Sequence, residues 1–211
     1  MVIQVDKATK VINGYLILDD VTLELHSGNI YGLQGPNGSG KTMLMRLISG
    51  LIQATKGTVY VDGQKLGTDI DFPPSVGILI ESPAFLPNYT GFKNLELFAL
   101  IKGKITSEQI RCTISDVGLD PDDKRKYRKY SLGMKQRLGI AAAIMEQPDL
   151  IILDEPTNAL DDLGIQQICK LIQRERDRGA LIVIACHDAA LLESISDEIL
   201  TVSEGRVQRK G

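Results

Sequence analysis

The sequence has few cysteines and no long apolar run. Its three cysteines, Cys112, Cys169 and Cys186, are far apart and odd in number. They therefore predict neither a disulfide framework nor a metal site, and we expect buried thiols. No apolar run reaches the roughly 18 residues that a membrane-spanning helix needs. The first ten residues also lack the charged start and apolar stretch of a signal peptide, so the sequence predicts a cytosolic chain.

Neither sign of charge dominates the sequence. Lys and Arg number 24 against 27 Asp and Glu, which leaves a formal net charge of −3. That balance excludes a broadly basic nucleic-acid coat, although it allows a local basic patch. Residues 124–129 (KRKYRK) form such a patch, which we interpret as a solvated helix or loop face. A length of 211 residues suits one large domain, or a domain with a subdomain.

Short apolar runs alternate with helical patterns. The continuous apolar runs 150–153 and 181–185 flank a helical pattern at 163–178, which predicts a parallel α/β core. Further strands are predicted at 2–5, 21–25, 29–34, 58–61 (an edge hairpin strand), 76–80 and 199–202. A helix is predicted at 41–49, ended by Gly50, and residues 82–144 read as mostly helical. Turns are predicted at 13–14 and at 204–205, the second leading into the tail.

Residues 35–42 (GPNGSGKT) match the pattern G-x-x-x-x-G-K-[ST] between a predicted strand and a predicted helix. Glycines let successive N–H groups converge on phosphate oxygens, and the helix N-terminus adds a favourable dipole. Lys41 is placed to bind the β- and γ-phosphates, and Thr42 offers a hydroxyl to Mg²⁺. The predicted nucleotide-binding residues are Gly35, Pro36, Asn37, Gly38, Ser39, Gly40, Lys41 and Thr42.

A second strand end carries two acidic residues. Asp154 and Glu155 directly follow the run 150–153, and ligands of parallel α/β sheets bind at the carboxyl ends of the strands. Asp154 is predicted to hold Mg²⁺, and Glu155 to act as the general base that polarises a water toward the γ-phosphate. Alone they would be interpreted as solvated loop acids, but beside a phosphate loop they predict a catalytic site.

The phosphate loop leaves kinases, GTPases and several ATPase classes open. No N-K-x-D sequence for guanine recognition occurs, which counts against a GTPase. Residues 130–137 (YSLGMKQR) resemble the LSGGQ signature, with its downstream Q-R, of the nucleotide-binding domain of ATP-binding cassette (ABC) transporters. Ser131 and Gly133 match that signature, whereas Tyr130, Leu132 and Met134 depart from it. The resemblance implies that Ser131 and Gly133 contact the γ-phosphate of ATP held by an opposite subunit.

Two further segments extend the resemblance. Residues 158–161 (NALD) resemble the D-loop S-A-L-D, which helps the two subunits communicate in that family; an Asp there would also cap a helix. His187 stands at the position of the family's switch histidine. The resemblance implies that His187 reaches the γ-phosphate and holds it in line with Glu155, so Lys41, Glu155 and His187 are the predicted catalytic residues.

Two positions depart from the family pattern. Glu81 stands where the family has the Q-loop glutamine; a carboxylate there can still approach Mg²⁺ or the attacking water, which makes Glu81 a candidate metal ligand. Its ionisation would add negative charge beside the phosphates. The family stacks adenine on an aromatic residue, and spacing places that position near Ile12. Tyr15 is the candidate substitute, with packing in a β-hairpin as the alternative.

Residues 81–95 resemble the subgroup of bacitracin and lantibiotic self-protection exporters. Phe85, Leu86 and Phe92 within this segment are candidates for docking a permease, the alternative being that they pack the helical region. The resemblance implies an α/β fold with a P-loop NTPase core, a mixed and largely parallel sheet, an N-terminal antiparallel β-subdomain and an inserted α-helical subdomain. One domain would span residues 1–211, with a core at about 1–81 and 145–211 and a helical subdomain at about 82–144.

The implied function is ATP hydrolysis by a subunit that dimerises around ATP and Mg²⁺, with itself or a similar chain. It would drive a separate membrane permease from the cytoplasmic face, with export favoured over import. The alternative is a soluble ABC-type ATPase acting on nucleic acid or ribosomes, but the sequence has no sustained heptads, no C-x-x-C pair and one P-loop, so no nucleic-acid partner is expected. A regulator that binds nucleotide without hydrolysis is a third reading, which Glu155 argues against.

Overall fold

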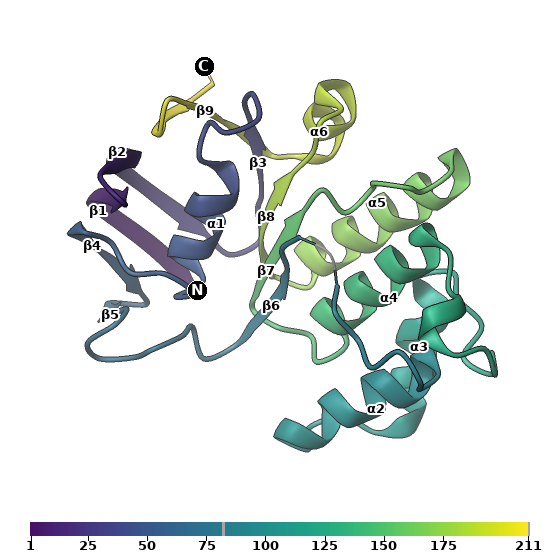
Figure 1. The fold of residues 1–211 in the computed structure, drawn as a ribbon. Helices are drawn as coiled ribbons and strands as arrows, with labels where there is room; N and C mark the ends of the chain where they lie inside the picture. Colours follow the sequence, from purple (N-terminus) through teal and green to yellow (C-terminus); the bar gives the residue numbers. More distant parts are fainter. Residues whose placement is uncertain (82, 211) are drawn as a thin grey trace.

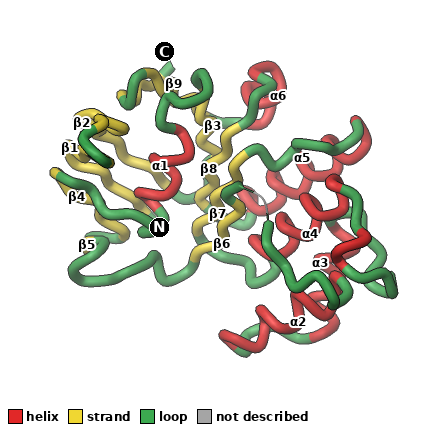
Figure 2. Tube along the Cα trace, viewed as in Figure 1, coloured by secondary structure: helices red, strands yellow, loops and turns green. Residues whose placement is uncertain are grey.

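The computed structural model describes residues 1–81 and 83–210. Helix α1 (Lys41–Ile48) lies between a smaller and a larger β-sheet, and the other helices lie on the far side of the larger sheet (Figure 1). Figure 2 shows the same division by secondary structure, with α2 to α5 grouped on one side. In the part of the chain that is described, no helix is long and apolar enough to cross a membrane.

The larger sheet has the strand order β10-β9-β3-β8-β7-β6. All neighbours run parallel except β9 and β10, which form a hairpin, so the turn at 204–205 leads into a strand and not directly into a tail. The strands are β3 (Ile30–Gln34), β6 (Val76–Leu79), β7 (Leu150–Asp154), β8 (Leu181–Ala185), β9 (Glu198–Ser203) and β10 (Arg206–Arg209).

The continuous apolar runs of this sheet reflect burial on both of its faces. In β7, Ile151 and Leu153 pack into the core on the side of the helices, whereas Leu150 and Ile152 pack toward α1 and the smaller sheet. The same alternation holds along β8. The predicted parallel α/β core is therefore confirmed, and its strands end together at one edge of the sheet.

The smaller sheet is antiparallel, with the order β2-β1-β4-β5. Its strands are β1 (Val2–Ile12), β2 (Tyr15–His26), β4 (Lys56–Val61) and β5 (Gln64–Lys65). The turn predicted at 13–14 is confirmed, and Asn13 and Gly14 both have the positive φ that a two-residue hairpin turn requires. The prediction of 58–61 as an edge strand is wrong, because β4 pairs with both β1 and β5.

The described part of the region predicted as helical from 82 to 144, residues 83–144, holds three α-helices and a 3-10 turn, separated by loops. They are α2 (Gly91–Lys102), α3 (Ser107–Asp116), η1 (Tyr127–Lys129) and α4 (Leu132–Ile144); Ser82 lies outside the described residues. Helix α5 (Asp162–Asp177) confirms the prediction at 163–178, and its N-cap Asp161 accepts a hydrogen bond from the Gly164 N–H at 3.1 Å. Helix α6 (Ala189–Ile195) was not predicted.

The exposure of the cysteines differs from the prediction, whereas that of the basic patch agrees with it. Cys169 and Cys186 are buried, but the prediction of three buried thiols is wrong, because Cys112 lies on an outer position of α3 and is exposed. The basic side chains of 124–129 are exposed as predicted. Tyr127 within that patch is buried, and its hydroxyl donates to the Pro83 carbonyl at 2.8 Å.

Candidate functional site

The predicted phosphate loop joins the end of β3 to the start of α1. Gly40, the N-cap of α1, has a left-handed φ of 111°, and a Cβ there would lie 3.1 Å from the Ile17 carbonyl oxygen. Glycine meets both demands because it has no side chain. Lys41 curls back over the loop, and its Nζ donates to the carbonyls of Gly35 at 2.7 Å and Pro36 at 3.0 Å. The loop thus holds an ammonium group where phosphate oxygens would bind.

The end of β7 meets this loop at Thr42. The Thr42 Oγ1 donates to the Asp154 Oδ2 at 2.7 Å, across 112 residues of sequence. Hydroxyl and carboxylate oxygens are ligands that Mg²⁺ prefers. Within the described residues, the buried Ser39 Oγ has no hydrogen-bond partner. These side chains therefore fit the phosphates and the cation of a magnesium-bound nucleotide.

Glu155 is held beside this pair by His187. The Glu155 Oε2 accepts the His187 backbone N–H at 3.1 Å, and Oε1 lies 3.3 Å from the His187 Nε2. Burial raises the pKa of Glu155 above its ordinary value, opposed first by the His187 N–H. The Asp154 charge raises that pKa further, and Lys41 lowers it. A carboxylate with a raised pKa is a stronger base, which suits proton abstraction from water.

One hollow of about 410 Å³ brings the charged and polar groups of the site together with Ile17 and Met43. The groups that line it are Lys41, Thr42, Asp154, Glu155 and His187. Tyr15 is not among the described residues that line it, and its side chain is 75% exposed at the start of β2. Ile17 lies two residues along the same strand and so on the same face. It lines the hollow, whereas Tyr15 does not. Ile17 was not predicted, although the alternation of β2 would have pointed to it. Adenine contact by Tyr15 stays a prediction.

Glu81 follows β6 and borders a second hollow of about 300 Å³, which Asp154 and Glu155 also line. The Glu81 residue has a left-handed φ of 63°, and its carboxylate is bound by the Arg46 guanidinium from α1. Thr42 does not line this hollow. Glu81 as a metal ligand therefore stays a prediction, while the partner that the structure provides is a cation. Arg46 was not predicted from the sequence.

Ser131 and Gly133 lie at the start of α4, outside the hollow that Lys41 lines. Ser131 is exposed and caps α4, its Oγ accepting the Met134 N–H at 3.2 Å. A Cβ on Gly133 would lie 2.6 Å from the Ala159 carbonyl oxygen. Glycine at this position therefore lets the helix approach residues 158–161 closely.

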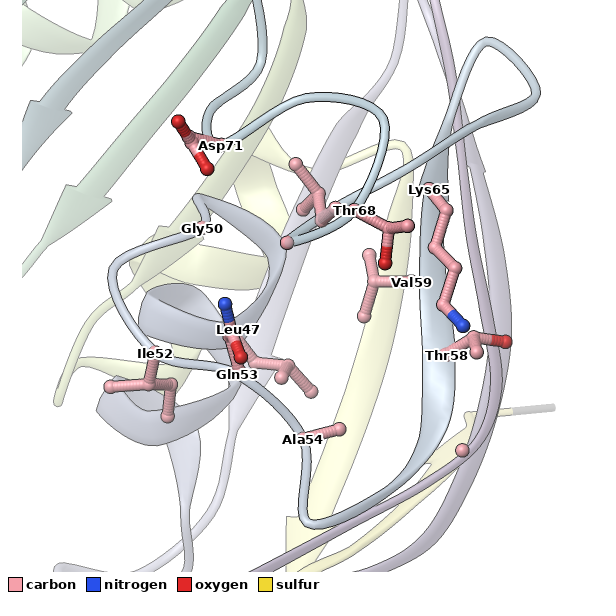
Figure 3. A pocket seen from close by; sticks show the side chains of 13 residues that line it. Leu47, Gly50, Ile52, Gln53, Ala54, Thr58, Val59, Lys65, Thr68 and Asp71 are labelled. Atoms are coloured by element: carbon pink, nitrogen blue, oxygen red, sulfur yellow. The ribbon is translucent and has the colours of Figure 1, made fainter.

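A separate cavity of about 220 Å³ lies at the other end of α1, between that helix and the β4–β5 hairpin (Figure 3). Its lining consists mostly of apolar residues and glycines, with Lys65 and Asp71 as its charged members. The phosphate loop, Asp154 and Glu155 do not line this cavity, so it is not part of the candidate site.

A glycine-rich loop between a parallel strand and a helix, facing acidic strand ends, defines a P-loop nucleotide-binding domain. Comparison with known proteins narrows that class. The sequence model of the ABC transporter family matches residues 18–158. The chain belongs to this family and is an ATP-binding ATPase cassette.

Individual relatives agree with this assignment. The chain is 44% identical to the uncharacterized ABC transporter ATP-binding protein YybJ of Bacillus subtilis (strain 168), over 98% of this chain and 94% of the relative. It is 38% identical to the bacitracin transport ATP-binding protein BcrA of Enterococcus faecalis, over 98% of this chain and 68% of that protein. A bacterial ABC transporter cassette solved as a dimer superposes with a TM-score of 0.86 at 26% identity, covering 98% of this chain and 97% of that chain.

Proposed function

We propose that this chain hydrolyses ATP with Glu155 as general base and that two copies do so together to drive a membrane permease. One observation carries the proposal. The Glu155 carboxylate, held by His187, borders the same hollow as Lys41 and the Thr42–Asp154 pair. A base, an ammonium group and a pair of oxygen ligands thus surround one space, as phosphoryl transfer requires.

In the proposed reaction the Glu155 carboxylate accepts a proton from a water molecule. The water oxygen forms a bond to the γ-phosphorus, the bond from that phosphorus to the β,γ-bridging oxygen breaks, and ADP leaves with the electron pair. Lys41 and the loop amides balance the negative charge of the phosphates. His187, which contacts the Glu155 carboxylate, would reach the γ-phosphate and hold it in line with Glu155. Bound Mg²⁺ would be held by the Thr42 hydroxyl and the Asp154 carboxylate, and would supply positive charge to the phosphates.

Each active site is proposed to include a second copy of the chain or a similar chain. The exposed Ser131 and the adjacent Gly133 would contact the γ-phosphate of ATP bound to that partner. Support comes from their position, because neither residue lines the hollow that Lys41 borders in their own chain. The 26% identical cassette that was solved as a dimer adds support.

We propose a separate integral-membrane permease as the other partner, with the chain bound to its cytoplasmic face and with export of a peptide antibiotic or a lipid-like compound. The similarity to a bacitracin transport ATP-binding protein supports this proposal. Of the three apolar side chains predicted for docking, Leu86 is 50% exposed. Phe85 and Phe92 are half-buried and pack against the core, so the proposed contact rests on Leu86.

We further propose that residues 82–144 form a subdomain that moves relative to a core of residues 1–81 and 145–211. Helices α2 and α3 contact each other and α4, which supports a subdomain, while α4 also packs against β6 and β7 of the larger sheet. The Glu81 segment enters this region beside the nucleotide site. Such a motion would transmit the state of the nucleotide to the permease.

The test compares the wild-type chain with Glu155→Gln, which keeps the size of the side chain but removes the base. ATPase rate is measured together with mass by size-exclusion chromatography and light scattering, with and without ATP and Mg²⁺. The expected result is a loss of hydrolysis and an ATP-dependent dimer. Glu108→Gln, which changes an exposed glutamate of α3, is the matched control and is expected to behave as wild type. Wild-type hydrolysis by Glu155→Gln would refute the general-base role.

A further inference from the structure

Gln136 on α4 makes a contact that the proposed reaction leaves unexplained. Its side chain is 9% exposed, and its Nε2 donates to the Glu155 backbone carbonyl at 2.9 Å. The residue borders the hollow of about 300 Å³ that Asp154 and Glu155 also line. The Gln136 amide on α4 therefore forms a hydrogen bond with the backbone of the proposed general base.

That backbone needs support from its surroundings. Glu155 has a left-handed φ of 51°, which is unfavourable for a residue with a side chain and persists only where neighbouring contacts impose it. Its N–H donates to the Ala185 carbonyl at 2.9 Å, and its carbonyl also accepts the Asn158 N–H at 3.2 Å. Among the described residues, Gln136 provides the side-chain hydrogen bond to this peptide. The carboxylate then extends to His187.

The same helix also carries the residues proposed to meet the partner's ATP. Ser131 is the N-cap of α4, and Gln136 lies five residues further along. Gly133 packs against the Ala159 carbonyl, so the first turns of α4 contact both ends of the segment from Glu155 to Ala159. A rigid helix therefore links the Ser131 region to the Glu155 backbone.

We infer that Gln136 is a positioning residue: its amide orients the Glu155 peptide so that the carboxylate faces the phosphates, and it couples that orientation to the position of α4. This inference rests on the proposed function. It predicts that closure of the Ser131 region on a partner's ATP improves the alignment of the Glu155 of the same chain.

The first experiment removes the amide. Gln136→Met keeps a flexible side chain of similar length, and Gln173→Met alters a half-buried glutamine on α5 as the matched control. We expect kcat for ATP to fall about tenfold or more, because the Glu155 peptide loses the hydrogen bond that orients the base for the transition state. The KM for ATP is expected to stay within about twofold and the Tm within about 4 °C, since packing is retained. The control is expected to leave kcat and KM unchanged.

In a second variant, Gln136→Glu, the proposed hydrogen bond depends on the protonation of the new side chain. In Gln136→Glu the ionised carboxylate cannot donate to the Glu155 carbonyl, whereas the protonated one can. Glu81, Asp154 and Glu155 are the charged residues that line the hollow with it, and their negative charge favours the protonated form. We therefore expect the kcat of Gln136→Glu, divided by that of the wild type at the same pH, to rise as the pH falls.

The outcomes separate this inference from the proposed function. Hydrolysis by the wild type and by Gln136→Met at equal kcat would overturn the positioning role and leave the general base untouched. A fall in kcat that comes with a fall in Tm of more than about 4 °C, and with a pH-independent ratio for Gln136→Glu, would assign a structural role and also overturn the inference. Absence of ATP hydrolysis by the wild type, or its retention in Glu155→Gln, would instead refute the proposed function.

Discussion

The Arg46 guanidinium of α1 is bound to the Glu81 carboxylate at the end of β6. Helix α1 begins at the phosphate loop, so this ion pair joins that loop's helix to the segment that leads into the helical region. Glu81 shares a hollow with Asp154 and Glu155, and a third carboxylate there would repel the phosphates. Arg46 offsets that charge.

We therefore expect Arg46→Met to weaken ATP binding. The unpaired Glu81 charge would raise the KM for ATP several-fold, at a coupling of about 1 kcal/mol for a partly exposed pair. Adding Glu81→Gln to Arg46→Met is expected to restore the KM, because it removes the repelling charge. The measurement is the KM in a double-mutant cycle, and additive effects of the two changes would contradict the coupling. Arg111→Met, which breaks the exposed pair with Asp122, is the control.

Thr42→Val tests the proposed cation site. Valine keeps the shape of threonine but cannot donate to the Asp154 carboxylate or offer an oxygen to Mg²⁺. We expect the Mg²⁺ concentration needed for half-maximal ATPase activity to rise by about tenfold or more. The same replacement at Thr113, which is half-buried on α3, should leave that concentration unchanged. An unaltered Mg²⁺ requirement in Thr42→Val would remove Thr42 from the site.

The raised pKa of Glu155 has a consequence for stability. Burial disfavours the ionised carboxylate in the folded chain, so its contribution is most favourable below the unfolded-state pKa and is lost as pH rises through the folded-state pKa. Glu155→Gln removes this penalty. Its Tm should therefore exceed that of the wild type at pH 8 and converge with it toward pH 4. A difference that grows toward acid pH would contradict the sign.

Gly133→Ala should destabilise the fold, although alanine normally stabilises a helix relative to glycine. The added Cβ would lie 2.6 Å from the Ala159 carbonyl oxygen, so the helix and residues 158–161 must separate. We expect a loss of about 1–3 kcal/mol in the free energy of unfolding, as for other overpacked sites, measured by denaturant titration. A gain in stability would show that the two segments are not packed as described.

The cysteines can be counted by thiol labelling. Cys112 is exposed, whereas Cys169 and Cys186 are buried. A maleimide should therefore modify one thiol in the folded chain and three after denaturation, as measured by mass spectrometry. The Cys112→Ser variant should take up no label while folded, and rapid labelling of that variant would contradict the burial of the other two.

Much of the site is readable from residues that are close together in the chain. The loop 35–42, the acidic pair after 150–153 and the turn at 13–14 each depend on backbone preferences and spacing within a few residues. Cys112 was misjudged because cysteine is usually buried, and its place on the outer face of α3 depends on how that helix packs. The bulges of β1 break the period-2 pattern, so the pattern predicts only part of that strand.

The sequence by itself determined that the chain binds a nucleotide phosphate through a P-loop next to a strand-end carboxylate, because those features are encoded in contiguous residues. Only the tertiary structure decided which side chains meet. Thr42 reaches Asp154, Arg46 reaches Glu81 and Gln136 reaches the Glu155 backbone because parallel strands bring their ends to one edge and α1 and α4 pack beside that edge. Such pairings depend on the packing of distant elements, which no local pattern records.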